Sequence, residues 1–270
     1  MFKKSMLILS IIITVIIIIL GHRAWVNSQK DIHRLSPTVV ESTSESVEST
    51  DSEESTDNNS EEDTGLSALI ANQPEHVQEI WLNSQETDEP VDIAIIATES
   101  SLLLDENWTT LLQEGLTSNY SGVVLNYSII PYEGTSEDQL TSLDEGSISL
   151  EDQDIVLYEL PTIHDGGVLS IDDQVYYTRL FLEEFQTSYP DSALFAFPSQ
   201  PFQNATYYPE MVEAVRETVE ENNIPYLNHW TDWPSTDDPE LENYLTEDDE
   251  PTELGHTTWG TNLVNYFSSN

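Results

Sequence analysis

The stretch Asp92–Ala97, which reads DIAIIA, is the first of several short apolar runs that decide the fold. Four more runs of strand length follow it, at Val123–Ile130 (VVLNYSII), Asp154–Tyr158 (DIVLY), Ala193–Phe197 (ALFAF) and Ile224–Leu227 (IPYL). Apolar runs of this length are typical of strands that are buried on both faces. We therefore expect a parallel sheet of five strands.

Segments with helical spacing separate these runs. Trp108, Leu112 and Leu116 share one helical face after the first run. Similar faces occur in Tyr177–Phe185, in Met211–Val219 and in Leu254–Phe267. Alternating strands and helices predict an α/β three-layer sandwich. Ligands of such sheets bind at the carboxyl ends of the strands, so candidate functional residues should follow the runs directly.

The charge of the chain is strongly acidic and unevenly distributed. Its 270 residues include 51 Asp and Glu, seven Lys and Arg, and no cysteine, which excludes disulfides, thiolate metal sites and cysteine nucleophiles. From Leu66 to Asn270 there are 40 acidic residues and two basic ones, a net charge of about −38. Such a surface repels nucleic acid, so we expect no nucleic-acid partner. Its self-repulsion favours a setting rich in screening cations.

Residues 6–26 are predicted to anchor the chain in a membrane. Met6–Gly21 has 16 residues without a charge, and a helix continued to Val26 would span about 31 Å, enough for a bilayer core. Residues 1–5 would form a short cytoplasmic tail, with the acidic bulk outside the cell membrane. The alternative is a cleaved secretory signal, although no small-x-small cleavage pattern follows the apolar run.

Residues 27–65 are predicted to be a disordered, acidic tether. Within them, Glu41–Thr64 has ten acidic residues, no basic residue and one apolar residue, so it cannot bury enough surface to offset its ordering entropy. The folded domain would then be residues 66–270, whose 205 residues lie within the range of a single core.

Residues suited to acyl chemistry follow the apolar runs. The hydroxyl-rich turn Thr98–Ser101 comes after the first run, and Gly134 comes after the second. His164 follows the third run, beside an aspartate and two glycines. Near the C-terminus, Glu253 precedes His256 by three residues. A nucleophile, a base, an acid that orients the base and donors for an oxyanion are the parts of Ser–His–acid catalysis.

This order of motifs resembles the SGNH, or GDSL-like, hydrolases over roughly residues 90–267. In that family, a flavodoxin-like sandwich carries a Gly-Asp-Ser nucleophile block, an oxyanion glycine, a Gly-x-Asn-Asp block and a late Asp-x-x-His. Three further stretches are similar to a bacterial envelope-associated branch of the family: FPSQP at 197–201, NATYYP at 204–209 and YLNHWTDWP at 226–234.

Two of the matching blocks depart from the family pattern. Thr98–Ser100 stands where the family has Gly-Asp-Ser, and a shift of one residue would put Glu99 at the nucleophile position. His164 replaces the asparagine of the third block, although a histidine can donate one hydrogen bond to an oxyanion if its tautomer is suitable.

The C-terminal block can be aligned in two ways. Glu253 and His256 can serve as the acid-x-x-His pair. Alternatively, Pro251, Gly255 and His256 match the frequent ending His-Pro-Asn-x-x-Gly-His, which puts Glu250 where the catalytic histidine belongs. In the second alignment, activity depends on His256 as a substitute base, or is absent.

The resemblance implies a role for each candidate residue. Ser100 would attack an ester carbonyl after His256 takes its proton, and Glu253 would hold the imidazole. The amides of Ser100 and Gly134, with the His164 side chain, would receive the oxyanion. No metal or organic cofactor is needed.

Other roles for these residues stay open. His229 is a reserve base, or an aromatic-packed histidine. Ser100 would also serve as a helix cap, and Gly134 as a simple turn glycine. The acidic run Glu247–Glu250 is predicted to be a solvated loop, since no calcium-binding Asp-x-Asp-x-Asp-Gly motif accompanies it.

The sequence thus predicts a membrane-anchored extracellular serine esterase of SGNH type that removes or transfers acyl groups, most plausibly O-acetyl, on envelope or secreted polysaccharide. Its partners would be that polysaccharide and, through the N-terminal helix, the membrane. One alternative is a non-catalytic protein of the same fold that binds glycan or a membrane partner. Another is an acidic surface protein whose charge is its function.

Overall fold

The computed structural model describes residues 60–269. The predicted tail 1–5, the anchor 6–26 and most of the tether 27–65 lie outside these residues. Helix α2 (Ser60–Leu69) includes the last part of the predicted tether and crosses the predicted boundary at Leu66. Within the described range, no helix combines the length and the apolar character needed to cross a membrane.

The sheet has four parallel strands in the order β2-β1-β3-β4. These are β1 (Val91–Thr98), β2 (Leu125–Tyr132), β3 (Ile155–Glu159) and β4 (Ala193–Phe197). In the centre of the sheet, Ile95 of β1 lies between Ile129 of β2 and Leu157 of β3. The predicted parallel α/β sandwich is confirmed.

The predicted fifth strand, Ile224–Leu227, is reduced to a single bridge. Tyr226 pairs with Ala196 of β4 in the parallel sense. Ala196 donates to the Pro225 carbonyl at 3.1 Å, and Leu227 donates to Ala196 at 2.8 Å. Pro225 has no N–H to extend the ladder, and the short helix η2 (His229–Asp232) begins two residues after Leu227. The expectation of five strands was therefore wrong by one.

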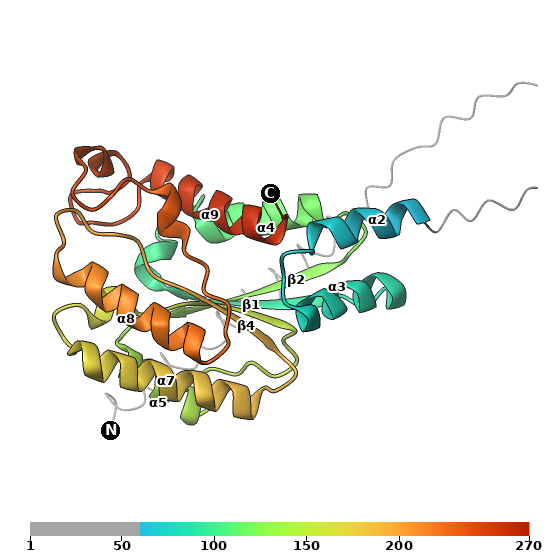
Figure 1. Ribbon diagram of the computed structural model, residues 1–270, viewed down its shortest axis with the longest axis horizontal. Coiled ribbons are helices and arrows are strands. Elements are labelled where there is room, and N and C mark those ends of the chain that lie inside the picture. Colours follow the sequence, from blue (N-terminus) through green and yellow to red (C-terminus); the bar gives the residue numbers. More distant parts are fainter. Residues whose placement is uncertain (1–59, 270) are drawn as a thin grey trace, which may run out of the picture. The chain divides into compact units, whose positions relative to one another are not determined.

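Helices cover both faces of the sheet (Figure 1). One face packs against α2, α3 (Glu75–Thr87), α4 (Trp108–Asn119) and α9 (Glu253–Phe267). The other packs against α5 (Ser136–Asp144), α7 (Ile171–Ser188) and α8 (Tyr207–Glu221). Residues of β1 alternate between the two cores, because side chains of a strand point to opposite faces in turn: Ile93 and Ile95 join the first, and Ala94 and Ile96 the second.

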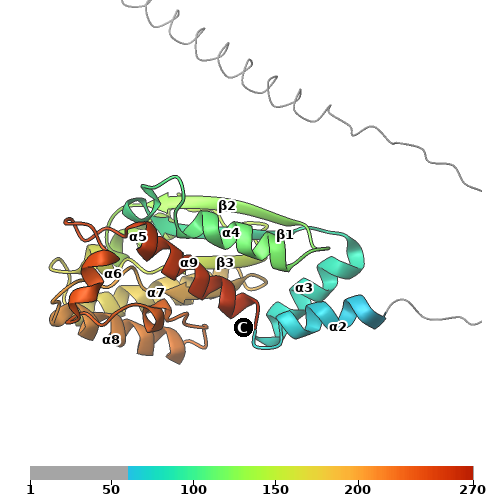
Figure 2. The ribbon, with the colours of Figure 1, turned by 90° about the horizontal axis from the view of Figure 1, so that it is seen from above.

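The carboxyl edge of the sheet holds several short helical segments. These are η1 (Glu99–Leu102) after β1, α6 (Thr162–Asp165) after β3, η2, and η3 (Pro239–Asn243). Figure 2 shows α6 at the opposite end of the domain from α2 and α3. The sequence-predicted site residues therefore lie far from the end of the domain where the described chain begins.

The first and last described segments are joined at that far end. The Gln73 side-chain amide donates to the Phe267 carbonyl at 3.1 Å, and Ser269 Oγ donates to the Leu69 carbonyl at 2.7 Å. Gln73 is buried and also accepts from the indole N–H of Trp81 at 2.7 Å. These bonds connect the α2–α3 turn to the end of α9.

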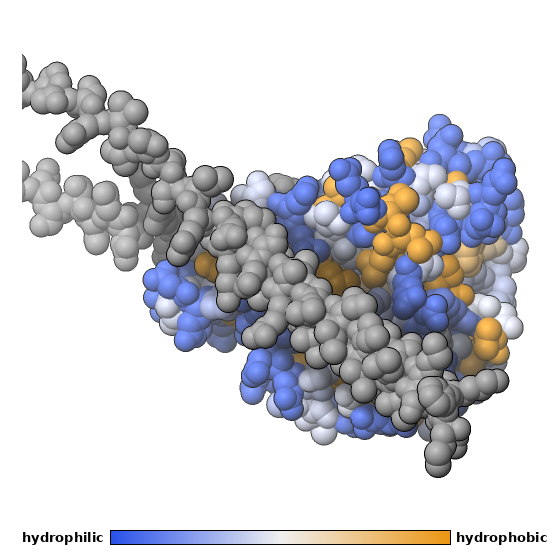
Figure 3. Space-filling view, turned by 180° about the vertical axis from the view of Figure 1, so that it is seen from behind, coloured by the Kyte–Doolittle hydropathy of each residue, from blue (hydrophilic) through white to orange (hydrophobic). Residues whose placement is uncertain are grey.

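Hydrophilic residues cover most of the visible described surface in the view from behind, with smaller hydrophobic patches among them (Figure 3). In residues 60–269, the ion pairs involve two arginines: Arg179 pairs with Glu183, and Arg216 pairs with Glu213 and Glu220. Most of the acidic side chains in this part of the chain therefore lack a basic partner.

Candidate active site

Ser100 lies in η1, directly after β1, and is half-buried. The turn forms here because the Thr98 side chain caps it, accepting a hydrogen bond from the Ser101 N–H at 3.3 Å. Ser100 Oγ donates to the same Thr98 hydroxyl oxygen at 3.3 Å. The predicted nucleophile is thus at the carboxyl edge, open to solvent on one side and bonded to Thr98 on the other.

A buried carboxylate, Glu159, lies behind this turn at the last position of β3. Its Oε2 accepts hydrogen bonds from the Thr98 N–H at 3.0 Å and from Ser101 Oγ at 2.7 Å. Its Oε1 accepts from Thr98 Oγ1 and Ser199 Oγ, each at 2.9 Å. Burial raises the pKa of Glu159 to about 7, although these hydrogen bonds oppose the shift.

Glu159 was missed by the sequence analysis. The signal was its position, because it immediately follows the apolar run Asp154–Tyr158 and a charged residue there must lie at the carboxyl edge of the sheet. In a chain with 51 acidic residues, one more glutamate carries little weight on its own.

His256 is buried in the first turn of α9, and its surroundings do not match the predicted triad. Its Nδ1 accepts a hydrogen bond from the Trp108 N–H at 3.4 Å. A neutral imidazole that accepts at Nδ1 carries its proton on Nε2. Burial lowers the pKa of His256 to about 4. Within residues 60–269, no hydrogen bond joins His256 to Ser100.

The predicted pairing of Glu253 with His256 is absent. Glu253 is exposed, and its carboxylate makes no hydrogen bond to His256 in the described structure. Nδ1, the atom that an orienting acid would hold, already accepts from Trp108, so it has no proton to give to a carboxylate. The assignment of Glu253 as the orienting acid is therefore corrected.

The second alignment of the C-terminal block has a structural basis in packing. A Cβ at Gly255 would overlap the Tyr244 carbonyl oxygen and would lie 3.2 Å from Pro251 Cβ, so glycine is required there. Leu245 and Pro251 form an isolated antiparallel bridge that holds this loop. Glu250, which takes the histidine position in this alignment, is half-buried beside it.

His229 cannot act as the reserve base. It is fully buried, its Nε2 lies 2.9 Å from the Pro198 carbonyl oxygen, and its Nδ1 accepts from the Trp233 indole N–H at 3.1 Å. Both ring nitrogens are therefore occupied. Burial lowers the pKa of His229 to about 3, which keeps the ring neutral. Its role is structural.

The predicted oxyanion residues lie on two loops that the structure joins. Gly134 has φ +96°, and a Cβ there would lie 2.7 Å from Asp138 Oδ2, so only glycine fits this turn at the start of α5. Asp165, next to His164 in α6, accepts a hydrogen bond from the Ser136 N–H at 2.8 Å. This bond places the His164 segment beside the Gly134 turn.

His164 is half-buried, and burial lowers its pKa, which favours the neutral ring. Its Nε2 is buried and has no hydrogen-bond partner among the described residues. The His164 ring lies edge-on to the Tyr132 ring, with their centroids 6.2 Å apart. The Tyr132 hydroxyl donates a hydrogen bond to the backbone carbonyl oxygen of Glu159 at 2.7 Å. The structure thus links His164 to Ser100 through Tyr132, Glu159 and Thr98.

Within residues 60–269, no three His, Asp or Glu side chains come together in a group that could hold a metal ion. The acidic run Glu247–Glu250 forms no such group. The arrangement at the carboxyl edge consists of hydroxyls, the buried carboxylates of Glu159 and Asp165, backbone amides and a histidine.

No protein-family model matches the sequence, and no curated protein matches it. Solved structures do match. The psychrotrophic esterase EstA from Pseudoalteromonas sp. is 18% identical with a TM-score of 0.51, over 66% of this chain and 97% of that one. The lipase/acylhydrolase from Enterococcus faecalis is 14% identical with a TM-score of 0.50, over 66% and 96%.

A further match, to a protein of the GDSL lipolytic family from Desulfitobacterium hafniense, has a TM-score of 0.51 and 14% identity, over 65% of this chain and 99% of that one. Each of these three solved chains is covered almost completely by the described domain. The chain therefore has the fold of the SGNH, or GDSL-like, hydrolases.

Proposed function

We propose that the chain is an SGNH-type ester hydrolase with Ser100 as its nucleophile. The observation that carries this proposal is the position of Ser100: a solvent-open hydroxyl in the turn after β1 of this fold, with its Oγ held by a hydrogen bond to Thr98. Strand ends at this edge are where ligands of parallel α/β sheets bind.

In the proposed reaction, Ser100 Oγ attacks the ester carbonyl carbon, and the developing oxyanion is stabilised by the Ser100 and Gly134 amides and by His164. His164 suits this role because its ring is half-buried at the carboxyl edge and its lowered pKa favours a neutral donor. His256 would position the start of α4 through its bond to the Trp108 amide.

The proposed substrate is an O-acylated polysaccharide of the envelope, and the proposed location is outside the membrane, anchored by residues 6–26 through the tether. Tyr207 is 49% exposed and Trp230 is half-buried, so both could stack on sugar rings. Tyr208 and Trp233, which the sequence also suggested for stacking, are buried and bond to interior groups instead. The acidic surface favours a neutral or cationic polymer over an anionic one.

The test compares hydrolysis of p-nitrophenyl acetate at high salt by the full-length chain, by Ser100→Ala and by Ser147→Ala. Ser147 is an exposed serine and serves as the matched control. We expect Ser100→Ala to lose at least about 100-fold in kcat, and Ser147→Ala to retain wild-type activity. Equal rates in the wild type and Ser100→Ala would overturn the proposed function.

A second candidate function is a non-catalytic glycan-binding protein. One observation favours it: His256 has its Nδ1 occupied and makes no bond to Ser100 or Glu253 within the described residues. Calorimetric titration with acetylated and de-acetylated polysaccharide distinguishes the two functions. A binder would take up acetylated polymer without releasing acetate, whereas an esterase would release acetate at a rate that depends on Ser100.

A further inference from the structure

We propose that Glu159 is the proton acceptor that prepares Ser100, and that it acts through the hydroxyl of Thr98. This inference rests on the proposed esterase function and replaces the histidine base of the resemblance with a buried carboxylate relay. It starts from two consecutive hydrogen bonds: Ser100 Oγ to Thr98 Oγ1 at 3.3 Å, and Thr98 Oγ1 to Glu159 Oε1 at 2.9 Å.

The direction of these bonds is fixed by the other partners of Thr98. An ionised carboxylate can only accept, so the single hydroxyl proton of Thr98 points to Glu159. The Thr98 oxygen then accepts with its lone pairs, from the Ser101 N–H and from Ser100 Oγ. A proton moving from Ser100 to Glu159 needs this orientation.

The position of Glu159 suits a proton acceptor. Glu159 and Thr98 are fully buried, whereas Ser100 is half-buried at the surface, so the relay connects an interior carboxylate to a hydroxyl that substrate can reach. Three hydrogen bonds besides that of Thr98 Oγ1 hold the carboxylate, from the Thr98 amide, Ser101 and Ser199.

Within residues 60–269, the ionisable groups whose charges couple to that of Glu159 include no cation. They are Tyr132 of β2, Tyr158 of β3 and Tyr208 of α8. Burial raises the pKa of Glu159 to about 7, near the range in which a general base works well at neutral pH. Above that pH the carboxylate is ionised and ready to accept a proton.

In the first step, the bond between Ser100 Oγ and the ester carbonyl carbon forms while the Ser100 proton moves to Thr98 and the Thr98 proton moves to Glu159. The bond from carbon to the leaving alkoxide then breaks, and the alkoxide takes a proton back from the relay, which leaves Glu159 ionised. Water next attacks the acyl group and gives one proton along the relay. The Ser100 Oγ–carbon bond breaks, and Oγ recovers that proton.

A purely structural role for Glu159 is the competing explanation, since the carboxylate also ties the end of β1 to β3 and to the loop after β4. The two explanations differ in their effect on the pH profile. A purely structural carboxylate contributes to stability only, whereas a proton acceptor sets the pH at which kcat/KM rises.

The test uses the full-length chain with Glu159→Gln, Thr98→Val and Thr98→Ser. Glutamine fits this site, because its carbonyl can replace Oε2 and accept the Thr98 N–H while its NH₂ faces hydroxyls that can rotate. Serine at position 98 keeps the relay hydroxyl, and valine removes it. Circular dichroism and thermal melts establish that each variant is folded.

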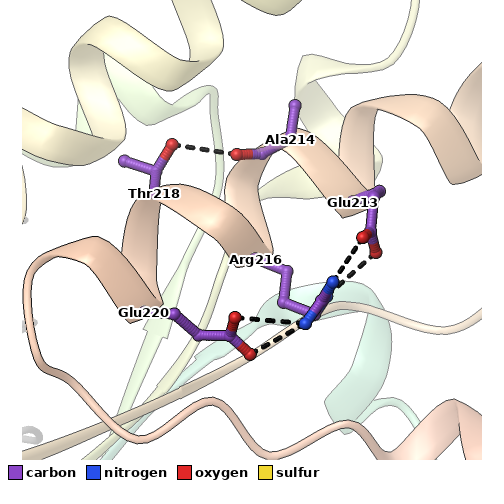
Figure 4. Close-up of polar contacts among 5 residues, drawn as sticks. All are labelled: Glu213, Ala214, Arg216, Thr218 and Glu220. Atoms are coloured by element: carbon purple, nitrogen blue, oxygen red, sulfur yellow. Dashed lines mark hydrogen bonds and ion pairs between the residues drawn. The ribbon is translucent and has the colours of Figure 1, made fainter.

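Two matched controls come from α8, where Figure 4 shows their polar contacts. Glu213→Gln removes an exposed glutamate that pairs with Arg216. Thr218→Val removes a buried hydroxyl that donates to the Ala214 carbonyl at 2.9 Å. They repeat the same chemical changes at positions that have no connection to Ser100.

For wild type and both controls, we expect kcat/KM for p-nitrophenyl acetate to rise with pH through an inflection near the pKa of Glu159, about 7. Glu159→Gln should lower kcat by at least about 100-fold with little change in KM and should abolish the inflection. Thr98→Val should do the same, and Thr98→Ser should stay within about five-fold of wild type.

Each result decides the inference. If Glu159→Gln folds and keeps the wild-type rate and pH profile, the relay is overturned and the proposed esterase function stands. If Glu159→Gln fails to fold, the same result for a folded Thr98→Val variant overturns the relay. A His256→Gln variant that alone removes the inflection overturns it too. If wild type and Ser100→Ala hydrolyse the ester equally slowly, the proposed function fails and the relay fails with it.

Discussion

The imidazole of His229 lies flat against the indole of Trp259, with ring centroids 4.3 Å apart and planes 6° apart. Trp259 also stacks on Trp108, at 5.0 Å and 10°. The three rings join η2, α9 and α4 on one face of the sheet. Because both His229 nitrogens are engaged, the ring is packed as a neutral group.

This packing predicts acid-sensitive stability. The pKa of His229 is about 3 in the folded protein, below its ordinary value of 6.5. Between these values the unfolded chain binds a proton that the folded chain does not, so the free energy of unfolding falls as pH drops below about 6.5. For so buried a ring, the full effect is on the order of several kcal/mol.

Urea unfolding of wild type and His229→Gln at pH 8 and pH 5 measures this effect. Glutamine can accept from Trp233 and donate to Pro198 but does not titrate, so the variant should lose less stability between the two pH values than wild type. At pH 8 it should be less stable by about 1–3 kcal/mol. His76→Gln, at an exposed position, is the control, and an equal pH response in wild type and His229→Gln would contradict the prediction.

Asp165 predicts a pH response of the opposite sign. Burial raises its folded pKa to about 6, above the ordinary 3.8, so its contribution to stability is complete below pH 3.8 and is lost as pH rises through 6. Asp165→Asn keeps an oxygen for the Ser136 N–H and carries no charge. Relative to wild type, it should gain on the order of 1–2 kcal/mol between pH 4.5 and pH 8 in denaturant unfolding. A difference that does not vary with pH would rule this out.

Gly134→Ala should destabilise the domain more than Gly122→Ala. Both glycines have positive φ, +96° and +108°, so alanine is strained at either position. A Cβ at Gly134 also lies 2.7 Å from Asp138 Oδ2, whereas a Cβ at Gly122 meets nothing within 4 Å. We expect the Gly134 variant to lose about 1–2 kcal/mol more in chemical denaturation and to disturb the Thr135–Asp138 capping box. Equal losses would show that Asp138 yields without cost.

Salt should stabilise the domain. Residues 66–270 carry 40 acidic and two basic residues, and the described ion pairs involve only Arg179 and Arg216. Raising NaCl from about 0.05 to about 0.5 M shortens the screening length and weakens the repulsion between these carboxylates. Tm should rise by several degrees in scanning calorimetry, more than in sucrose of equal osmolality. A fall in Tm would show that the few ion pairs matter more than the repulsion.

The sequence predicted the sheet well because its apolar runs are short, continuous and separated by helices of clear periodicity. Four of the five predicted runs form strands, and β4 has the predicted bounds. The fifth failed because Pro225 interrupts the ladder, and a run of four residues has too few hydrogen bonds to absorb that loss.

The site was predicted less well, because spacing along the chain does not specify contacts. Ser100, Gly134 and His164 do lie at the carboxyl edge. Glu253 and His256 are three residues apart in α9, yet one is exposed and the other is buried against the Trp108 amide. Glu159 was missed since only the folded chain shows that one glutamate among many is surrounded by hydroxyls.

The bonds of Gln73 to Phe267 and of Ser269 to Leu69 have a mechanical consequence. A pull on the chain ahead of Ser60 would act first on α2 and α3, where these bonds connect them to α9, at the end of the domain opposite α6 (Figure 2). Such a force would strain these two hydrogen bonds before it distorted the turn that holds Ser100. If residues ahead of Ser60 tether the domain as proposed, mechanical load would reach these bonds before it reached the site.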